Sequence, residues 1–169
     1  MKTAIVISTA PGREAWVRDC LESIKSPAIV VSTGGYELGK LKWVYTNTSL
    51  DKFVFLQDSI VVRNEPELLR LLNQEGSTCL MDVPRCLGSY LGIYEREILD
   101  KVEIPEVTTK EESIRQEIEW TAKYKAQCEV FNHPQPSIEH TQVHTVYRHG
   151  RQNLLYVNRL YEKWKGTWR

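Results

Sequence analysis

The sequence lacks the features of a membrane protein and of a secreted one. No stretch of its 169 residues holds about eighteen consecutive apolar side chains, which excludes a membrane-spanning helix. Its first apolar stretch is only about six residues long and ends at Pro-Gly-Arg-Glu, which is too short for a signal-peptide core. The cysteines, Cys20, Cys79, Cys86 and Cys128, show no Cys-x-x-Cys spacing. We therefore expect a cytoplasmic protein with buried, reduced thiols.

A net charge is also missing, because 22 Lys and Arg residues balance 22 Asp and Glu residues. The chain thus lacks the overall positive field that indicates nucleic-acid binding. Positive charge gathers only in the last segment, which contains Arg148, Arg151, Arg159, Lys163, Lys165 and Arg169 beside the single acidic residue Glu162. This basic segment is either a phosphate-binding surface or a solvated helix face.

No internal repeat, low-complexity tract or linker interrupts the chain. Its length suits one domain with a sizeable core, and a hydrophobic content of 41% is ordinary for a globular protein. We expect a single domain over residues 1–169.

The chain begins with a strand, a helix and a second strand. Residues 3–8 and 28–32 are apolar runs of strand length. Between them, apolar side chains recur at helical spacing from Glu14 until the chain reaches Pro27. This order predicts an α/β fold with a Rossmann-type mixed, mostly parallel sheet flanked by helices.

Capping signals mark two later helices. Asn64 and Glu67 predict a helix start, and Thr109 with Glu112 predicts the start of the longest helix, which runs to about residue 126. Further strands are expected at residues 41–45, 78–81 and 90–94, and further helices at residues 95–102 and 151–163.

An isolated acidic residue, Asp58, follows the unbroken apolar run of residues 53–56. Such a run is typical of a strand buried on both faces of a parallel sheet. Open α/β sheets bind ligands at the carboxyl ends of their strands, so Asp58 is a candidate ligand-binding residue. The alternative is an Asp that bonds the backbone of its own turn.

The sequence contains the segments VISTAPGREAWVRDCLESI, FVFLQDSIVV and GSYLGIYEREIL. Together they resemble nucleotide-sugar glycosyltransferases with the GT-A fold, of the short bacterial or bacteriophage type. The resemblance implies transfer of a hexosyl or pentosyl group from a nucleotide-diphosphate donor, a UDP-sugar in the first instance. The implied acceptor is a hydroxyl group, with a hydroxylated base in phage DNA as one candidate.

The resemblance also implies a metal, Mn²⁺ or Mg²⁺, bound by Asp58 at the place of the family's DXD motif. The motif here is Gln57-Asp58-Ser59, with one carboxylate where the family usually has two. His144 or His149 is then the candidate for a further metal ligand. These histidines are equally well interpreted as surface or hydrogen-bonded side chains.

The donor is expected to contact the turn after the first strand, where backbone amides and a guanidinium suit an anion. The residues predicted to bind it are Thr9, Pro11, Arg13, Thr33, Gln57, Asp58 and Arg151. A helix start with an exposed Arg13 is the simpler interpretation of that turn.

The acceptor is expected at Gly88, Ser89 and Tyr90 in the third resembling segment. If the reaction inverts the sugar, a carboxylate must act as general base, and Glu111 and Glu117 are the candidates beside Asp58 as catalytic residues. Glu112 already has a role in helix capping. For most other large aromatic residues we expect core packing: Trp43, Tyr94, Trp120 and Tyr124.

Two other functions stay open. A degenerate α/β module would bind a nucleotide or DNA without chemistry, which suits the single carboxylate of Asp58. A nucleotidyltransferase also places an Asp at a strand end, but its usual Gly- and Lys-rich opening is absent from this sequence.

Overall fold

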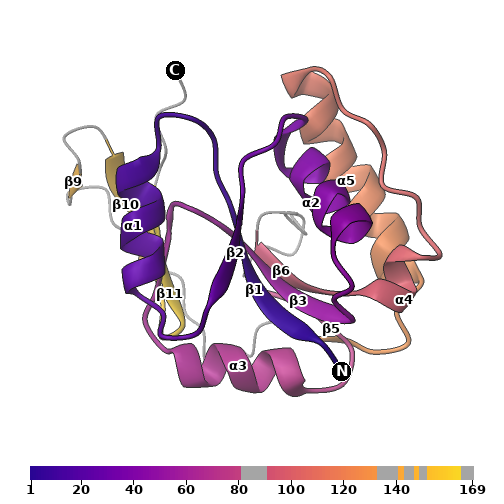
Figure 1. The fold of residues 1–169 in the computed structure, drawn as a ribbon, viewed down its shortest axis with the longest axis horizontal. Coiled ribbons are helices and arrows are strands. Elements are labelled where there is room, and N and C mark those ends of the chain that lie inside the picture. Colours follow the sequence, from indigo (N-terminus) through magenta and orange to yellow (C-terminus); the bar gives the residue numbers. More distant parts are fainter. Residues whose placement is uncertain (81–90, 133–140, 143–146, 149–151, 165–169) are drawn as a thin grey trace.

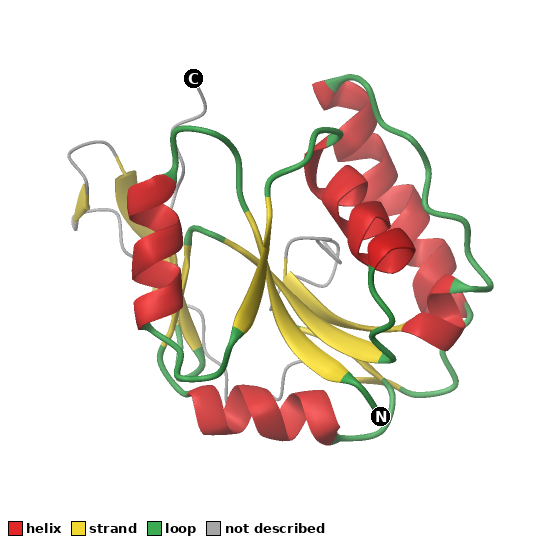
Figure 2. Ribbon diagram, in the orientation of Figure 1, coloured by secondary structure: helices red, strands yellow, loops and turns green. Residues whose placement is uncertain are grey.

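The computed structural model describes residues 1–80, 91–132, 141–142, 147–148 and 152–164. A six-stranded sheet forms its centre, with helices on both sides (Figures 1 and 2). In spatial order the strands are β2 (Ala28–Val31), β1 (Thr3–Ser8), β3 (Lys52–Gln57), β6 (Leu91–Glu95), β5 (Ser77–Cys79) and β7 (Phe131–Asn132). Only β6 runs against the other strands of this sheet. The predicted mixed, mostly parallel sheet is confirmed.

Strand register brings three strand ends to one edge of the sheet. Ser8 at the end of β1 lies opposite both Val31 of β2 and Gln57 of β3. Because these strands are parallel, the loops that follow them emerge side by side at their carboxyl ends. The Asp58 amide donates to the Ser8 carbonyl at 2.9 Å, so Asp58 directly follows β3 at this edge, as predicted.

Alternation along the strands creates two cores, one on each face of the sheet. Ile5 and Ile7 of β1 pack beneath helices α1 (Glu14–Glu22) and α3 (Glu65–Asn73). Val6 between them faces helices α2 (Tyr36–Asn47), α4 (Arg96–Leu99) and α5 (Lys110–Ala126). Figure 1 shows these two groups of helices on opposite sides of the sheet. Residues 53–56 of β3 are at most 1% exposed, which confirms a strand buried on both faces.

Aromatic side chains hold α5 against the sheet. The ring centroids of Tyr94 and Tyr124 lie 5.2 Å apart, and those of Trp120 and Tyr124 lie 5.5 Å apart. The Tyr124 hydroxyl accepts a hydrogen bond from the backbone amide of Glu95 at 2.8 Å. The predicted core role of these aromatic residues is confirmed.

Both predicted helix caps are present. The side chain of Asn64 accepts a hydrogen bond from the Glu67 amide at 3.1 Å, and that of Thr109 accepts one from the Glu112 amide at 3.2 Å. The Glu112 carboxylate accepts from the amide of Thr108. Glu112 is thus engaged at the start of α5, where it bonds the amide that precedes the N-cap residue Thr109.

The strand predicted at residues 41–45 is wrong, because these residues lie within α2. Leu38, Leu41 and Val44 of this helix are all fully buried. A spacing of three residues places such side chains on one face of a helix, and burying that face outweighs the local strand pattern.

The terminal helix predicted at residues 151–163 is also wrong. This segment forms strands β10 (Gln152–Val157) and β11 (Tyr161–Trp164), which belong to a second sheet with β4 (Ile60–Val62) and β8 (Thr141–Gln142). Strand β9 (Tyr147–Arg148) pairs with β10. The Asn158 side chain accepts hydrogen bonds from the amides of Leu160 and Tyr161, both at 2.8 Å, and so fixes a turn where a helix would continue.

Cys20 and Cys79 are buried, as predicted, and the cysteines of the described ranges, these two and Cys128, form no disulfide. Among the described residues, no helix has both the length and the apolar character needed to cross a membrane.

Candidate functional site

A pocket of about 710 Å³ opens at the carboxyl ends of β1, β2 and β3. It is bounded by the loop after β1, the start of α2, the end of β3 and one face of α5. Most of the surface inside it is apolar, and polar and charged residues line it together with glycines and apolar residues: Ala10, Pro11, Ser32, Thr33, Gly34, Gly35, Tyr36, Glu37, Lys40, Gln57, Lys110, Ser113, Ile114 and Glu117. Four residues predicted from the sequence therefore meet here: Pro11, Thr33, Gln57 and Glu117.

The start of α2 forms one wall of the pocket through a sharp turn. Gly35 has a φ of 85°, a backbone conformation that suits glycine, and a Cβ at this position would come within 3.0 Å of the Gly39 backbone. This turn directs the first turn of α2 toward the pocket, where Tyr36 and Glu37 line it. Helix N-termini attract anions through their unpaired amides. The Thr33 hydroxyl oxygen is buried and has no hydrogen-bond partner among the described residues.

Asp58 forms a buried ion pair beside the pocket. Its Oδ2 accepts from Arg13 Nε at 2.6 Å and its Oδ1 accepts from Arg13 Nη2 at 2.7 Å. The Thr9 hydroxyl donates to Oδ2 at 2.7 Å. The side chains of Arg13 and Asp58 are only 13% and 5% exposed. The structure thus joins three predicted donor-binding residues in one cluster, and Arg13 is not the exposed side chain of the simpler interpretation.

Lys163 reaches the same edge from strand β11. Its ammonium group donates to Gln57 Oε1 at 2.6 Å and also to the Ser59 hydroxyl. The pKa of Lys163 is lowered to about 8, mainly by burial and least by the positive charge of Arg13, while the charges of Glu37 and Asp58 act in the opposite direction. Two cations and two carboxylates are therefore close enough to interact at the ends of β1 and β3.

The carboxyl groups of Glu37 and Glu117 both line the pocket, and they are close enough for the charge of Glu37 to act on Glu117. Glu37 is 6% exposed and accepts a hydrogen bond from the Ser8 hydroxyl at 2.6 Å. Burial, and to a smaller extent the nearby charge of Glu37, raise the pKa of Glu117 to about 7. A carboxyl group with a pKa near neutrality can accept or release a proton at physiological pH.

No protein-family model matches the sequence, and no curated protein matches it. Solved structures are similar in fold. The catalytic domain of Drosophila β1,4-galactosyltransferase 7, in complex with xylobiose, superposes with a TM-score of 0.57 at 10% identity over 80% of this chain. Residues 1–349 of TarS from S. aureus give 0.54 at 12% identity over 80% of the chain. The protein A197 from STIV gives 0.57 at 12% identity over 100% of this chain and 97% of its own.

The chain has the GT-A fold. It spans 65% of the galactosyltransferase chain and 58% of the TarS chain. Within this GT-A fold, the pocket and the Asp58 cluster occupy the carboxyl edge of the sheet, where α/β folds bind their ligands.

The remaining predicted residues are not all placed. Gly88, Ser89, Tyr90, His144, His149 and Arg151 lie outside the described residues. Glu111 is exposed on the first turn of α5. Of the two predicted bases, Glu117 is therefore the one that lines the pocket.

A divalent metal ion does not fit the described surroundings of Asp58. Both carboxylate oxygens already accept hydrogen bonds from the Arg13 guanidinium, and the Lys163 ammonium holds the side chains on either side of Asp58 in the chain. Across the described residues, no group of three His, Cys, Asp or Glu side chains is arranged to hold a metal. Metal ligation by Asp58 and a histidine stays a prediction.

From the sequence we did not identify Glu37 as a site residue, and we placed Lys163 in a helix, whereas it lies in strand β11. Glu37 follows the Gly-Gly turn after the second strand, and an acidic residue in the first turn of a helix there was a usable signal. No local sequence signal indicated the contact between Lys163 and Gln57. These residues are far apart in the chain, and the pairing of β11 with β4 brings them together.

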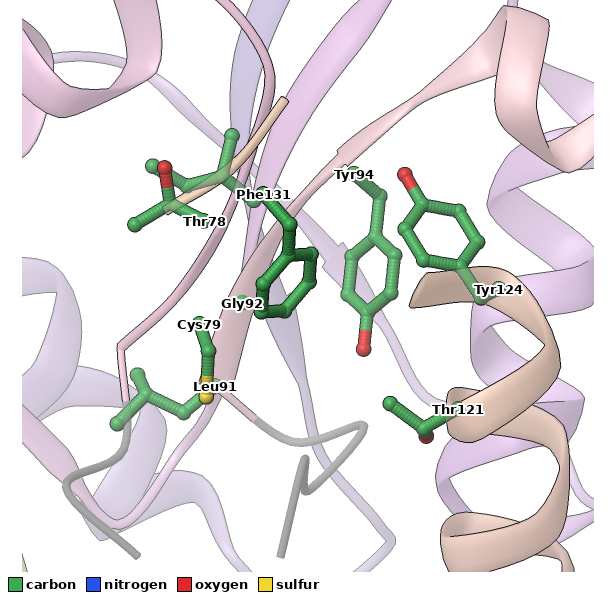
Figure 3. Close-up of a pocket in the computed structure, with 9 residues that line it drawn as sticks. Thr78, Cys79, Leu91, Gly92, Tyr94, Thr121, Tyr124 and Phe131 are labelled. Carbon is green, nitrogen blue, oxygen red and sulfur yellow. The ribbon is translucent and has the colours of Figure 1, made fainter. Parts of the chain in front are cut away.

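A second cavity, of about 20 Å³, lies between β5, β6 and α5 (Figure 3). Tyr94 and Thr121 line it, and the Thr121 hydroxyl oxygen is buried without a hydrogen-bond partner among the described residues. This cavity has room for about one water molecule and none for a nucleotide.

Proposed function

We propose that this protein is a glycosyltransferase that binds a nucleotide-diphosphate sugar in the pocket beside Asp58 and transfers the sugar to a hydroxyl acceptor. The observation that carries the proposal is the position of the pocket. It lies at the carboxyl edge of a GT-A sheet and combines a helix N-terminus, lysines and a carboxyl group with a pKa near 7. Each of these features suits part of a sugar nucleotide.

The pocket has complementary groups for a nucleotide. Lys40 and Lys110, together with the N-terminus of α2, suit the negative charge of a diphosphate. The buried Glu37 carboxylate suits ribose hydroxyl groups, which are hydrogen-bond donors. Pro11 and Tyr36 offer apolar surface to a base. A volume of about 710 Å³ falls in the range of small-molecule sites.

The transfer step needs a base and stabilisation of the leaving group. The acceptor oxygen forms a bond to the anomeric carbon while the bond from that carbon to the diphosphate breaks, and its electron pair stays on the diphosphate. In an inverting reaction the acceptor proton passes to a carboxylate, and Glu117 is our candidate. In a retaining reaction Glu117 has no such role.

We propose a UDP-sugar as the first donor to test and a hydroxylated DNA base or a glycan as acceptor. The first experiment is a thermal-shift panel of nucleotides and nucleotide sugars, each with and without Mn²⁺. A ligand that binds only the folded state raises the melting temperature, by an amount that corresponds to about 2.7 kcal/mol at a hundredfold excess over Kd. We expect a shift with a nucleotide diphosphate and with its sugar conjugate.

The same sugar nucleotide then decides between catalysis and binding. Release of free nucleotide, in buffer or with DNA that carries a hydroxymethylated base, supports the transferase. A shift without release of nucleotide under any acceptor condition favours a non-catalytic nucleotide-binding module. If no nucleotide or sugar nucleotide changes the melting temperature, the proposed function is wrong.

A further inference from the structure

We propose that the ammonium group of Lys163, and not a divalent cation, stands beside the diphosphate of the bound donor. The protein would then bind a nucleotide diphosphate without metal. This inference rests on the proposed function, because it concerns how the same pocket compensates the charge of its ligand.

The carboxylate of Asp58 is already paired. Arg13 contacts both of its oxygens at 2.6 and 2.7 Å, which is the short, bidentate geometry of a strong charge-assisted pair. The Thr9 hydroxyl takes a further acceptor position on Oδ2. A divalent cation at Asp58 would have to displace the guanidinium or approach it closely against charge repulsion.

Lys163 lies next to the strand-end carboxylate. Its ammonium group bonds Gln57 and Ser59, the two neighbours of Asp58 in the chain, and Gln57 lines the pocket. A cation is therefore already present next to the strand-end carboxylate. It is held by backbone structure, because Lys163 lies opposite Ile60 in the β11–β4 ladder and the Trp164 amide donates to the Ser59 carbonyl at 2.9 Å.

Burying the positive charge of Lys163 has a cost. Desolvation disfavours the charged form of Lys163, and the negative charges of Glu37 and Asp58 offset only part of this effect. An apolar side chain would join β11 to the rest of the fold without this cost. An incoming diphosphate supplies compensating negative charge. When the sugar–oxygen bond breaks, the electron pair stays on the diphosphate, and a fixed ammonium stabilises that charge.

The test is isothermal titration calorimetry with UDP, GDP, ADP, CDP and dTDP, each in EDTA and in Mn²⁺. Wild type, Lys163→Met and Lys123→Met are compared, and Lys123 is an exposed lysine on α5 that provides the matched loss of one charge. For the nucleotide that binds, we expect the same Kd within about twofold in both buffers. Lys163→Met should weaken it about tenfold or more and leave the affinity of the matching nucleoside unchanged. Lys123→Met should bind as wild type.

Several outcomes overturn the inference. A nucleotide that binds the wild type only in Mn²⁺ contradicts it and leaves the proposed function standing. Unchanged diphosphate affinity in a folded Lys163→Met variant, or equal losses of nucleotide and nucleoside, assigns Lys163 a structural role only. If Lys163→Met does not fold, the wild-type comparison in the two buffers decides, with Lys163→Arg as the charge-preserving variant. No binding by any of the five nucleotides in either buffer removes both proposals.

Discussion

Glu117 is the residue whose ionisation is most open to experiment. Its pKa rises from 4.5 to about 7 in the folded protein, first through burial and second through the charge of Glu37. The folded state therefore holds this proton more tightly than the unfolded chain does. The corresponding stability is fully present below about pH 4.5 and is lost as the pH rises through about 7.

We expect Glu117→Gln to remove this pH dependence. Relative to the variant, the wild type should lose stability between about pH 4.5 and 7, measured as the urea midpoint at a series of pH values. Glu119→Gln on the exposed face of α5 is the control and should follow the wild type. A constant difference between wild type and Glu117→Gln at all pH values would show that the pKa of Glu117 is not raised.

If Glu117 is the base, kcat of the transfer should also fall by about 10²–10⁴-fold.

At the scale of elements, the sequence predicted strands and helices well where one strong signal dominated. The buried run of β3 and the caps of α3 and α5 were confirmed because each depends on neighbouring residues alone. Residues 41–45 and the segment 151–163 were predicted wrongly. In both, distant partners decide the structure: α2 packs against the central sheet, and β11 needs β4 to pair with.

The turn between β10 and β11 is the element that places Lys163. Asn158 is 5% exposed and accepts two backbone hydrogen bonds in this turn. We expect Asn158→Ala to destabilise the protein by about 1–3 kcal/mol, because two buried amides lose their acceptor. Urea denaturation measures this loss, and Asn158→Asp, which keeps the acceptor oxygen, should restore most of it. Equal losses in both variants would argue against the hydrogen bonds as the cause.

At the scale of the whole molecule, sequence and structure contribute different parts of the site. Thr9, Arg13 and Asp58 could be named from the sequence because they lie in the turns that follow β1 and β3. Their mutual contacts, and the approach of Glu37 and Lys163, follow from sheet order and from the second sheet, which no local pattern encodes. The candidate site is thus assembled from segments that are far apart in the chain.

This assembly predicts a coupled response to ligand. A nucleotide diphosphate that contacts the loop after β1, the start of α2 and the end of β3 should reduce local opening in all three at once, and in α5 and β11 that pack beside them. We expect hydrogen exchange, followed by mass spectrometry with and without saturating UDP, to slow at residues 9–13, 33–40, 57–59, 110–117 and 161–164 together. Helix α3 packs on the opposite face of the sheet and serves as the internal control. Protection confined to residues 9–13 would mean that the ligand binds at the first turn alone and that the pocket is not its site.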